Sequence, residues 1–123
     1  SLLPAQAYYK AQQLRTMLRQ QVLDSLEKYD VLVLPTSGKG AQPREEDPSV
    51  TSKETAGRLA FLFTRIFNLA SCPAMSVPCG FDHRNMPVGL QIGARPGAEE
   101  TIFKVAHAYE QATSWHTMRP PGV

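Results

Sequence analysis

Serine is the first candidate nucleophile for acyl transfer, a reaction that needs a hydroxyl or thiol beside a general base. Ser71 and Ser76 lie close together near the middle of the sequence. Neither stands in a Gly-x-Ser-x-Gly elbow or a Ser-x-x-Lys pair. Ser76 falls at the centre of an expected strand, so we interpret it as a packing residue. A small hydrolase that uses Ser71 or Ser76 with His107 stays open as a hypothesis.

The histidines and cysteines are too dispersed to predict a metal site. His83 lies in a polar turn, His107 in a helical pattern and His116 in the tail. Cys72 and Cys79 are separated by an expected strand, and seven extended residues span about 23 Å. A disulfide tolerates a Cα separation of only about 7 Å. We therefore predict two reduced cysteines, no metal and no other cofactor.

Three polar segments have a plain structural interpretation. The run Ser37–Gly40 superficially resembles an anion-binding loop, but it lacks the Gly-x-x-x-x-Gly-Lys-Ser/Thr spacing that wraps a phosphate. The acids Glu45–Asp47 lie in a loop, and Glu99–Glu100 open a helix whose dipole favours negative charge there. We expect a solvated turn, a solvated loop and a helix start.

Composition excludes several classes of protein. A chain of 123 residues with 42% hydrophobic and 20% charged residues is expected to form one ordered domain, residues 1–123. A formal charge of +2 with scattered basic residues gives no nucleic-acid patch. No apolar run reaches the ~20 residues that cross a bilayer. We expect a soluble cytoplasmic protein that binds neither nucleic acid nor membrane.

The N-terminal third predicts a helix followed by a strand. An apolar stripe supports the helix from Pro4 to Tyr29, and Arg15 and Arg19 are expected on its opposite, solvated face. The short apolar run Val31–Leu34 is rich in β-branched residues and predicts a strand covered on both faces. The stripe repeats every four residues at Leu14, Leu18, Val22 and Leu26.

The middle of the chain predicts a long loop and a second helix. The polar loop, residues 37–50, is long for a domain of this size. Thr51–Glu54 then matches a capping box, in which a hydroxyl at the cap and a carboxylate three residues later satisfy helix-end N–H groups. An apolar stripe that includes Phe63 and Phe67 follows it.

The C-terminal half predicts two strands and a last helix. The strands are Ala74–Val77 and Val88–Ile92, joined by a dense turn signal and therefore expected to be antiparallel. Pro96 precedes the last helix, and the tail 115–123 has no expected regular structure. The fold class is therefore α/β, a small mixed sheet of about three strands covered by three main helices.

Five segments of the chain occur in the order and at the spacing of one family pattern. They are Tyr8–Arg15, Tyr29–Thr36, Thr64–Gly80, Pro87–Ile92 and Glu99–Glu100. Together they resemble the C-terminal portion of the amidase signature family, which includes the amidases and the proteins similar to the A subunit of glutamyl-tRNA amidotransferase. One such segment would be a weak signal, whereas five in order are specific.

The resemblance implies an α/β/α fold around a large mixed sheet and a supporting role for this segment. In that family the catalytic Ser-Ser-Lys machinery and its Gly/Ser-rich loop lie upstream, and this chain has no counterpart of them. The resemblance therefore implies that the chain is inactive alone. It also implies that Phe61, Thr64, Asn68 and Cys72 lie at the wall of the acyl-binding pocket.

The chain departs from the family pattern at two points. Family members that use glutamine commonly carry an acid three positions before the motif threonine, where this chain has Phe61. Phe61 cannot pair with a substrate ammonium, so the resemblance implies a neutral or aromatic amide as substrate. Cys72 stands where the family usually has glycine, after Ser71 at another position that is normally small.

Two interpretations of function remain. The first is the substrate-pocket and scaffold portion of an amidase, completed by an N-terminal portion that this chain lacks. The alternative is a stand-alone interaction or ligand-binding module that self-associates through its exposed sheet. Because a fragment of a larger sheet exposes apolar surface, we expect a homo-oligomer or a partner that covers it.

Overall fold

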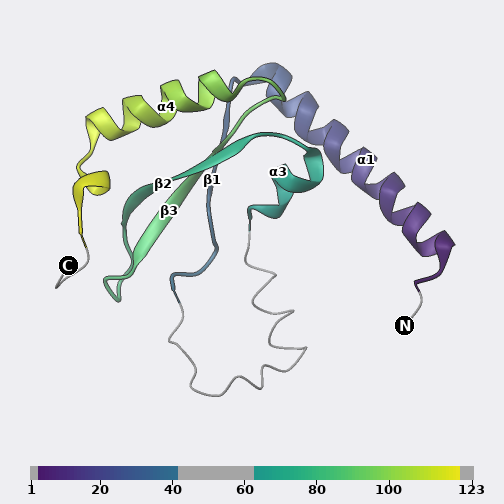
Figure 1. The fold of residues 1–123 in the computed structure, drawn as a ribbon, viewed down its shortest axis with the longest axis horizontal. Coiled ribbons are helices and arrows are strands. Elements are labelled where there is room, and N and C mark those ends of the chain that lie inside the picture. The colour runs from purple at the N-terminus through teal and green to yellow at the C-terminus, as the bar shows by residue number, and fades with distance from the viewer. Residues whose placement is uncertain (1–2, 42–62, 120–123) are drawn as a thin grey trace, which may run out of the picture.

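A computed structural model of the chain describes residues 3–41 and 63–119 (Figure 1). Helices and strands follow one another along these residues in the predicted order, and a three-stranded sheet forms the centre. In chain order the elements are α1 (Ala5–Lys28), β1 (Leu32–Pro35), α3 (Arg65–Ala70), β2 (Ala74–Phe81), β3 (Pro87–Gly93), α4 (Glu99–Ala112) and the 3-10 turn η1 (Trp115–Thr117).

The sheet has the strand order β1-β3-β2, with β3 in the centre. Both pairings are antiparallel, so the expectation of a mixed sheet is corrected for the described residues. The reason is topological: β2 returns directly as β3, and β1 pairs with the opposite edge of β3. The expected three strands and the antiparallel return are confirmed. Strand β2 also runs beyond the predicted end at Val77, past a bulge between Pro78 and Gly80.

The turn between β2 and β3 is built around the carboxylate of Asp82. Its Oδ1 accepts hydrogen bonds from the backbone N–H groups of Arg84 at 2.8 Å and Met86 at 2.9 Å. Asn85 takes a left-handed conformation with φ 60°, which asparagine tolerates better than most residues. The turn signal in the sequence therefore predicted the position of this hairpin.

The two faces of the sheet are covered by different helices, as Figure 1 shows. On one face, Ile92 and Val77 pack with Ile102 and Ala106 of α4 in an apolar cluster. On the other face, a second cluster joins Val22 and Leu26 of α1 to Ala70 of α3, with Leu32 of β1 packed against it. The result is a small α/β/α arrangement.

Strand β1 is less covered than the sequence predicts. Its residues alternate between half-buried and exposed, and the side chain of Val33 is 48% exposed. The expectation that both faces of Val31–Leu34 are covered is therefore wrong for the described residues. A continuous apolar run does not distinguish a buried central strand from a strand whose cover is only partial.

The buried apolar residues of helix α1 all lie in its C-terminal half. Val22 and Leu26 of the predicted stripe are buried, whereas Leu14 is 58% exposed and Met17 is 61% exposed. The N-terminal half of the helix projects away from the sheet (Figure 1). Arg15 is exposed, as the sequence predicts, whereas Arg19 is half-buried, and both donate hydrogen bonds to the end of α3.

Several predictions fall outside the described residues. Most of the loop 37–50, the capping box Thr51–Glu54 and Phe61 lie there. The tail, to which the sequence assigned no regular structure, carries the single 3-10 turn Trp115–Thr117. Its Trp115 ring makes an edge-to-face contact with Phe81 of β2, with ring centroids 6.2 Å apart.

Candidate functional site

Two hydroxyl groups meet on the face of the sheet opposite α4. Thr36 follows β1, Ser76 lies in β2, and their side-chain oxygens are 2.6 Å apart. They approach across Gly89 of the central strand, where a Cβ atom would stand 2.6 Å from the Ser76 oxygen and 2.8 Å from the Thr36 oxygen. Glycine at position 89 is therefore what lets side chains from the two outer strands share a hydrogen bond.

This hydroxyl pair lines an open groove of about 530 Å³. The groove lies at the end of the sheet where β1 leads into the following loop and the β2–β3 hairpin begins. Its size falls within the range of small-molecule sites, about 300–1,000 Å³. The lining residues are Thr36, Ser37, Lys39, Gly40, Ala41, Ser76, Val77, Pro78, Pro87, Val88 and Gly89.

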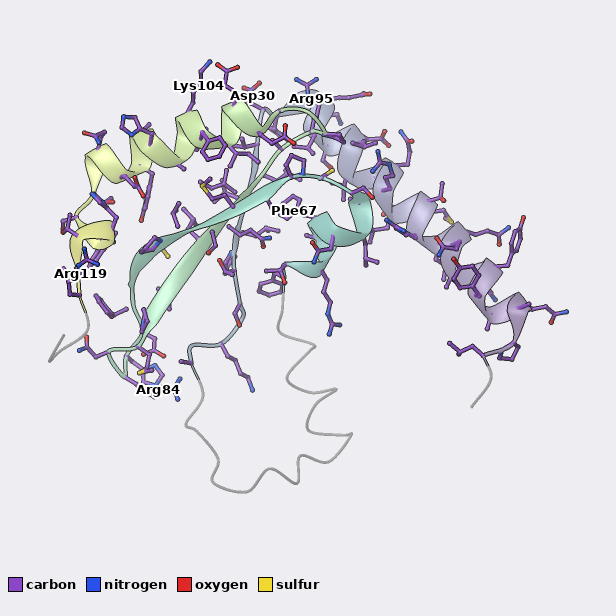
Figure 2. The ribbon with its side chains drawn as sticks, viewed as in Figure 1. Asp30, Phe67, Arg84, Arg95, Lys104 and Arg119 are labelled. Atoms are coloured by element: carbon purple, nitrogen blue, oxygen red, sulfur yellow. The ribbon has the colours of Figure 1, made fainter. Side chains whose placement is uncertain are left out.

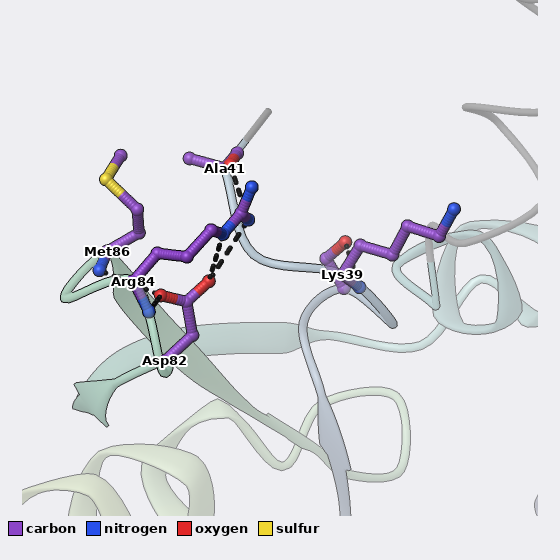
Figure 3. Close-up of polar contacts among 6 residues, drawn as sticks. Lys39, Ala41, Asp82, Arg84 and Met86 are labelled. Carbon is purple, nitrogen blue, oxygen red and sulfur yellow. Dashed lines mark hydrogen bonds and ion pairs between the residues drawn. The ribbon is translucent and has the colours of Figure 1, made fainter. Parts of the chain in front are cut away.

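One wall of the groove is tied to the hairpin by an arginine. Arg84 donates from Nη2 to the carbonyl of Ala41 at 2.8 Å and to the Asp82 carboxylate at 3.1 Å (Figure 3). The hydrogen bond from the Met86 N–H, with others from Arg84, holds the pKa of Asp82 below its ordinary value. The start of the loop after β1 is thereby fixed beside the turn.

Neither candidate serine lies beside His107. Ser76 lies opposite the face that α4 covers, whereas His107 is an exposed residue of α4. The hydroxyl of Ser71 accepts a hydrogen bond from Arg15 at 2.9 Å, on the α1 side of the sheet. The hypothesis of a hydrolase that pairs either serine with His107 therefore finds no support in this geometry. The described part of the chain also holds no group of three potential metal ligands.

Three of the four residues expected at the pocket wall are on or beside α3. Thr64 precedes the helix and is half-buried, Asn68 is exposed, and Cys72 follows the helix half-buried. Phe61 lies outside the described residues. None of these residues lines the groove between Thr36 and Gly89. The α3 segment and the groove are thus separate features, and the pocket wall stays a prediction from the family resemblance.

The thiol of Cys72 is held in the neutral form by its surroundings. Partial burial raises the pKa of Cys72, while the positive charge of Arg19 acts in the opposite direction. Its Sγ lies 3.7 Å from the carbonyl oxygen of Ala70. Both cysteines are free, as predicted. The effect of burial on the pKa is larger than the effect of Arg19. We therefore interpret Cys72 as a packing residue and not as an activated nucleophile.

Sequence reasoning missed four residues that shape these sites: Thr36, Gly89, Arg15 and Arg19. The first two had a usable signal, because a Pro-Thr pair ends β1 and a glycine interrupts the alternation of β3. The arginines had no such signal, since their partners are 51 or more residues away along the chain.

Gln91 of β3 is a further polar residue inside the fold. It is 4% exposed, and its Oε1 has no hydrogen-bond partner among the described residues. In the strand register it lies opposite Ser76 on one side and Leu34 on the other. Burying a hydrogen-bond acceptor without a donor costs free energy. Among the described residues, the Oε1 atom of Gln91 is such an acceptor.

Comparison with known proteins agrees with the resemblance seen in the sequence. The family model described as Amidase matches residues 2–103. The A subunit of the glutamyl-tRNA(Gln) amidotransferase from Gloeothece citriformis (strain PCC 7424) is 42% identical over 116 residues, covering 94% of this chain and 23% of that protein. Its counterpart from Rippkaea orientalis (strain PCC 8801 / RF-1) is 43% identical over 116 residues, with the same coverage. The chain therefore spans about a quarter of the length of these relatives.

Solved structures agree with the sequence relatives. The A subunit of the glutamyl-tRNA(Gln) amidotransferase from Thermotoga maritima matches with a TM-score of 0.75 and 32% identity, over 92% of this chain and 24% of that one. A 6-aminohexanoate cyclic dimer hydrolase matches with a TM-score of 0.81 and 30% identity, over 97% of this chain and 27% of that one. The family match, the relatives and the fold agree, and the chain belongs to the amidase family.

Proposed function

We propose that this chain is the C-terminal substrate-pocket and scaffold portion of an amide hydrolase and is inactive alone. The observation that carries the proposal is coverage: the chain matches nearly its whole length to relatives of which it spans only 23%. The geometry supports it, since neither Ser71 nor Ser76 lies beside His107. An acyl-transfer enzyme needs a nucleophile beside a base, so the remaining portion would have to supply that pair.

In this proposal α3 and the residues around it form a wall for the acyl group of the substrate. Thr64 and Asn68 are four positions apart and so lie on one side of the helix, with Asn68 exposed. Phe61 stands where glutamine-using relatives commonly have an acid. We therefore propose a neutral or aromatic amide as substrate, because a phenyl ring cannot balance a substrate ammonium.

The first experiment compares the 123-residue chain with the full-length product of its gene. Ammonia release is measured with a neutral aliphatic amide and with glutamine, and aniline release is measured with an anilide. We expect hydrolysis of the aliphatic amide and the anilide by the full-length protein and none by the chain alone. Turnover by the isolated chain that disappears in the Ser76→Ala variant would overturn the proposal.

A second variant tests the substrate class. In the full-length protein, Phe61→Asp introduces a carboxylate that can pair with the ammonium of glutamine. We expect the ratio of kcat/KM for glutamine to kcat/KM for the neutral amide to rise about tenfold or more. The physical reason is that a new charge pair in a pocket with little water favours the charged substrate. Phe63→Asp is the matched control, because Phe63 is exposed and precedes α3. Equal ratios in the two variants would argue against a pocket position for Phe61.

One observation favours the alternative function, a stand-alone module that self-associates through its sheet. Within the described residues each outer strand pairs only with β3, and Val33 of β1 is 48% exposed. Exposed edges and apolar side chains favour association with a second copy. Light scattering of the isolated chain tests it. A stable dimer with no activity in the full-length gene product supports this alternative, whereas a monomer at micromolar concentration contradicts it.

A further inference from the structure

Two arginines one turn apart on α1 hold the C-terminal end of α3. Arg15 donates from Nε to the carbonyl of Leu69 and from Nη2 to the hydroxyl of Ser71, both at 2.9 Å. Arg19 donates from Nη1 to the carbonyl of Ala70 and, at 3.5 Å, to that of Ser71. We call this pair of side chains the arginine clamp. It contacts three consecutive residues of a segment more than 50 positions away.

Helix α3 needs such support because it is short. Six residues are too few for a helix to be stable in isolation, and its last carbonyls have no partners within the helix. The chain then turns through Ser71 in the left-handed region, with φ 52°. This conformation is costly for a residue with a Cβ atom. The clamp supplies donors to the unpaired carbonyls and to the Ser71 side chain.

The apolar contacts of α3 fix its distance from the sheet. Phe67 is buried and points from α3 onto the sheet at Gly93, where its ring occupies the space a side chain would take (Figure 2). Ala70 packs against Val22 and Leu26 of α1. A short helix seated on two such contacts can still rotate about the line that joins them. Directional hydrogen bonds from the clamp remove that freedom.

Two of the residues that the resemblance assigns to the pocket wall, Thr64 and Asn68, are not among the residues that the clamp contacts. Asn68 lies next to Leu69, whose carbonyl Arg15 holds, yet its own side chain is exposed. Thr64 lies one turn earlier, on the same side of the helix. Any rotation of α3 would therefore move Thr64 and Asn68 together.

We propose that Arg15 and Arg19 are positioning residues that set the wall formed by Thr64 and Asn68, and through it the size of acyl group accepted. This inference rests on the proposed function. The guanidinium groups touch neither substrate nor reacting atoms. They act through α3, and their loss changes the discrimination between bulky and small acyl groups more than it changes turnover of the small one.

The experiment uses the full-length gene product and two neutral amides, acetamide and benzamide. Arg15→Met removes the fork to Leu69 and Ser71, and we expect the benzamide-to-acetamide ratio of kcat/KM to change about tenfold. Arg15→Lys keeps the charge but not the two-point geometry, so we expect an intermediate change. Lys10→Met is the matched control, because it removes a positive charge from the exposed part of α1 and should leave the ratio unchanged.

A second measurement separates failure of the clamp from failure of the proposed function. Alkylation of Cys72 by iodoacetamide reports on the end of α3, and Cys79 in the hairpin is the internal reference. We expect Arg15→Met to increase the alkylation rate of Cys72 about fivefold or more relative to Cys79, as loss of a local restraint allows. An unchanged relative rate overturns the clamp itself.

The two readouts together decide between the possibilities. Absence of amide hydrolysis in the full-length wild-type protein overturns the proposed function, and the positioning role falls with it even if Cys72 becomes more reactive. Activity with an unchanged benzamide-to-acetamide ratio overturns the positioning role alone. A uniform loss of kcat for both amides in Arg15→Met, with no change in their ratio, indicates a purely structural contribution and also overturns it.

Discussion

On one face of the central strand Ile92 is enclosed by apolar side chains from α4 and β2, and on the other face Gly93 makes room for a single phenyl ring from α3. The first contact belongs to a continuous apolar cluster that includes Ile102 and Ala106 of α4. The second belongs to a region in which α1 and α3 touch through few apolar residues and through the arginine clamp. We refer to these as the α4 side and the α1–α3 side.

The difference shows which part of the chain is self-sufficient. Non-directional apolar burial tolerates small shifts, so the α4 side can keep its packing whatever lies beyond it. The α1–α3 side depends on hydrogen bonds to specific carbonyls and leaves Leu14 and Met17 of α1 exposed. Exposed apolar side chains on a helix favour contact with another protein segment. This agrees with a chain that spans about a quarter of the length of its relatives.

The largest effect is expected from a cavity on the α4 side. Ile92→Ala removes a side chain that is 1% exposed, and we expect a loss of about 2–5 kcal/mol in the free energy of unfolding. Urea denaturation followed by circular dichroism measures it. Val33→Ala, on the outer strand β1, is the control and should cost about 0.5 kcal/mol or less. Similar losses in both variants would mean that the α4 side is not the stable half of the fold.

The next effect comes from the point where α3 is seated on the sheet. A Cβ atom at position 93 would lie within 2.6 Å of three atoms of the Phe67 ring, and Phe67 is only 1% exposed, so its ring has little room to move aside. We expect Gly93→Ala to cost about 1–3 kcal/mol. The double variant with Phe67→Leu should recover part of this loss, because the smaller side chain vacates the space. Independent, additive losses would contradict the contact.

The α4 side is also the half that the sequence predicted best. The hairpin, the helix that begins near Glu99 and the apolar face containing Ile102 and Ala106 follow from local periodicity and turn residues. The α1–α3 side depends on contacts between distant segments. Arg15 is exposed as predicted, but the contacts that Arg15 and Arg19 make with α3 could not be predicted, because an arginine that bonds to a distant segment looks the same in the sequence as a solvated one.

The residues of the candidate site also fall into two groups, those to which the sequence pointed and those to which it did not. The family pattern pointed to Thr64, Asn68 and Cys72, and the structure places these residues on or beside one short helix. It did not point to the groove at Thr36, Ser76 and Gly89, which exists only because three strands align in one register. Register is set by the whole sheet and is not visible in any one strand.

A smaller effect tests the polar contact that ends α3. Ser71→Gly relieves the left-handed backbone but removes the hydroxyl that accepts from Arg15. The two consequences oppose each other, so we expect a change in the free energy of unfolding within about 1 kcal/mol. A double-mutant cycle with Arg15→Met should give a coupling of about 0.5–1 kcal/mol. The same cycle with Lys10→Met should give none, and coupling in both would assign the effect to charge alone.

The smallest effect is expected in the hairpin turn, and it concerns pH. Hydrogen bonds from Met86 and Arg84 place the folded-state pKa of Asp82 below its ordinary value of 3.8. A depressed pKa in the folded state means that the ionised carboxylate contributes stability above pH 3.8, and that this contribution is lost as pH falls through the folded-state value. Asp82→Asn should therefore show a flatter decline in stability below pH 3.8 than the wild type. Urea midpoints between about pH 2.5 and 6 measure it.

The control for this comparison lies on α4. Glu100 pairs with Lys104 on the exposed surface at 2.7 Å, and an exposed pair of this type contributes little. Glu100→Gln should leave the pH dependence almost unchanged. If Asp82→Asn and Glu100→Gln flatten the curve equally, the hairpin carboxylate is not specially held, and the turn is fixed by its backbone alone. If only Asp82→Asn does so, the ionised Asp82 carboxylate, through its hydrogen bonds with Met86 and Arg84, stabilises the turn beside the groove.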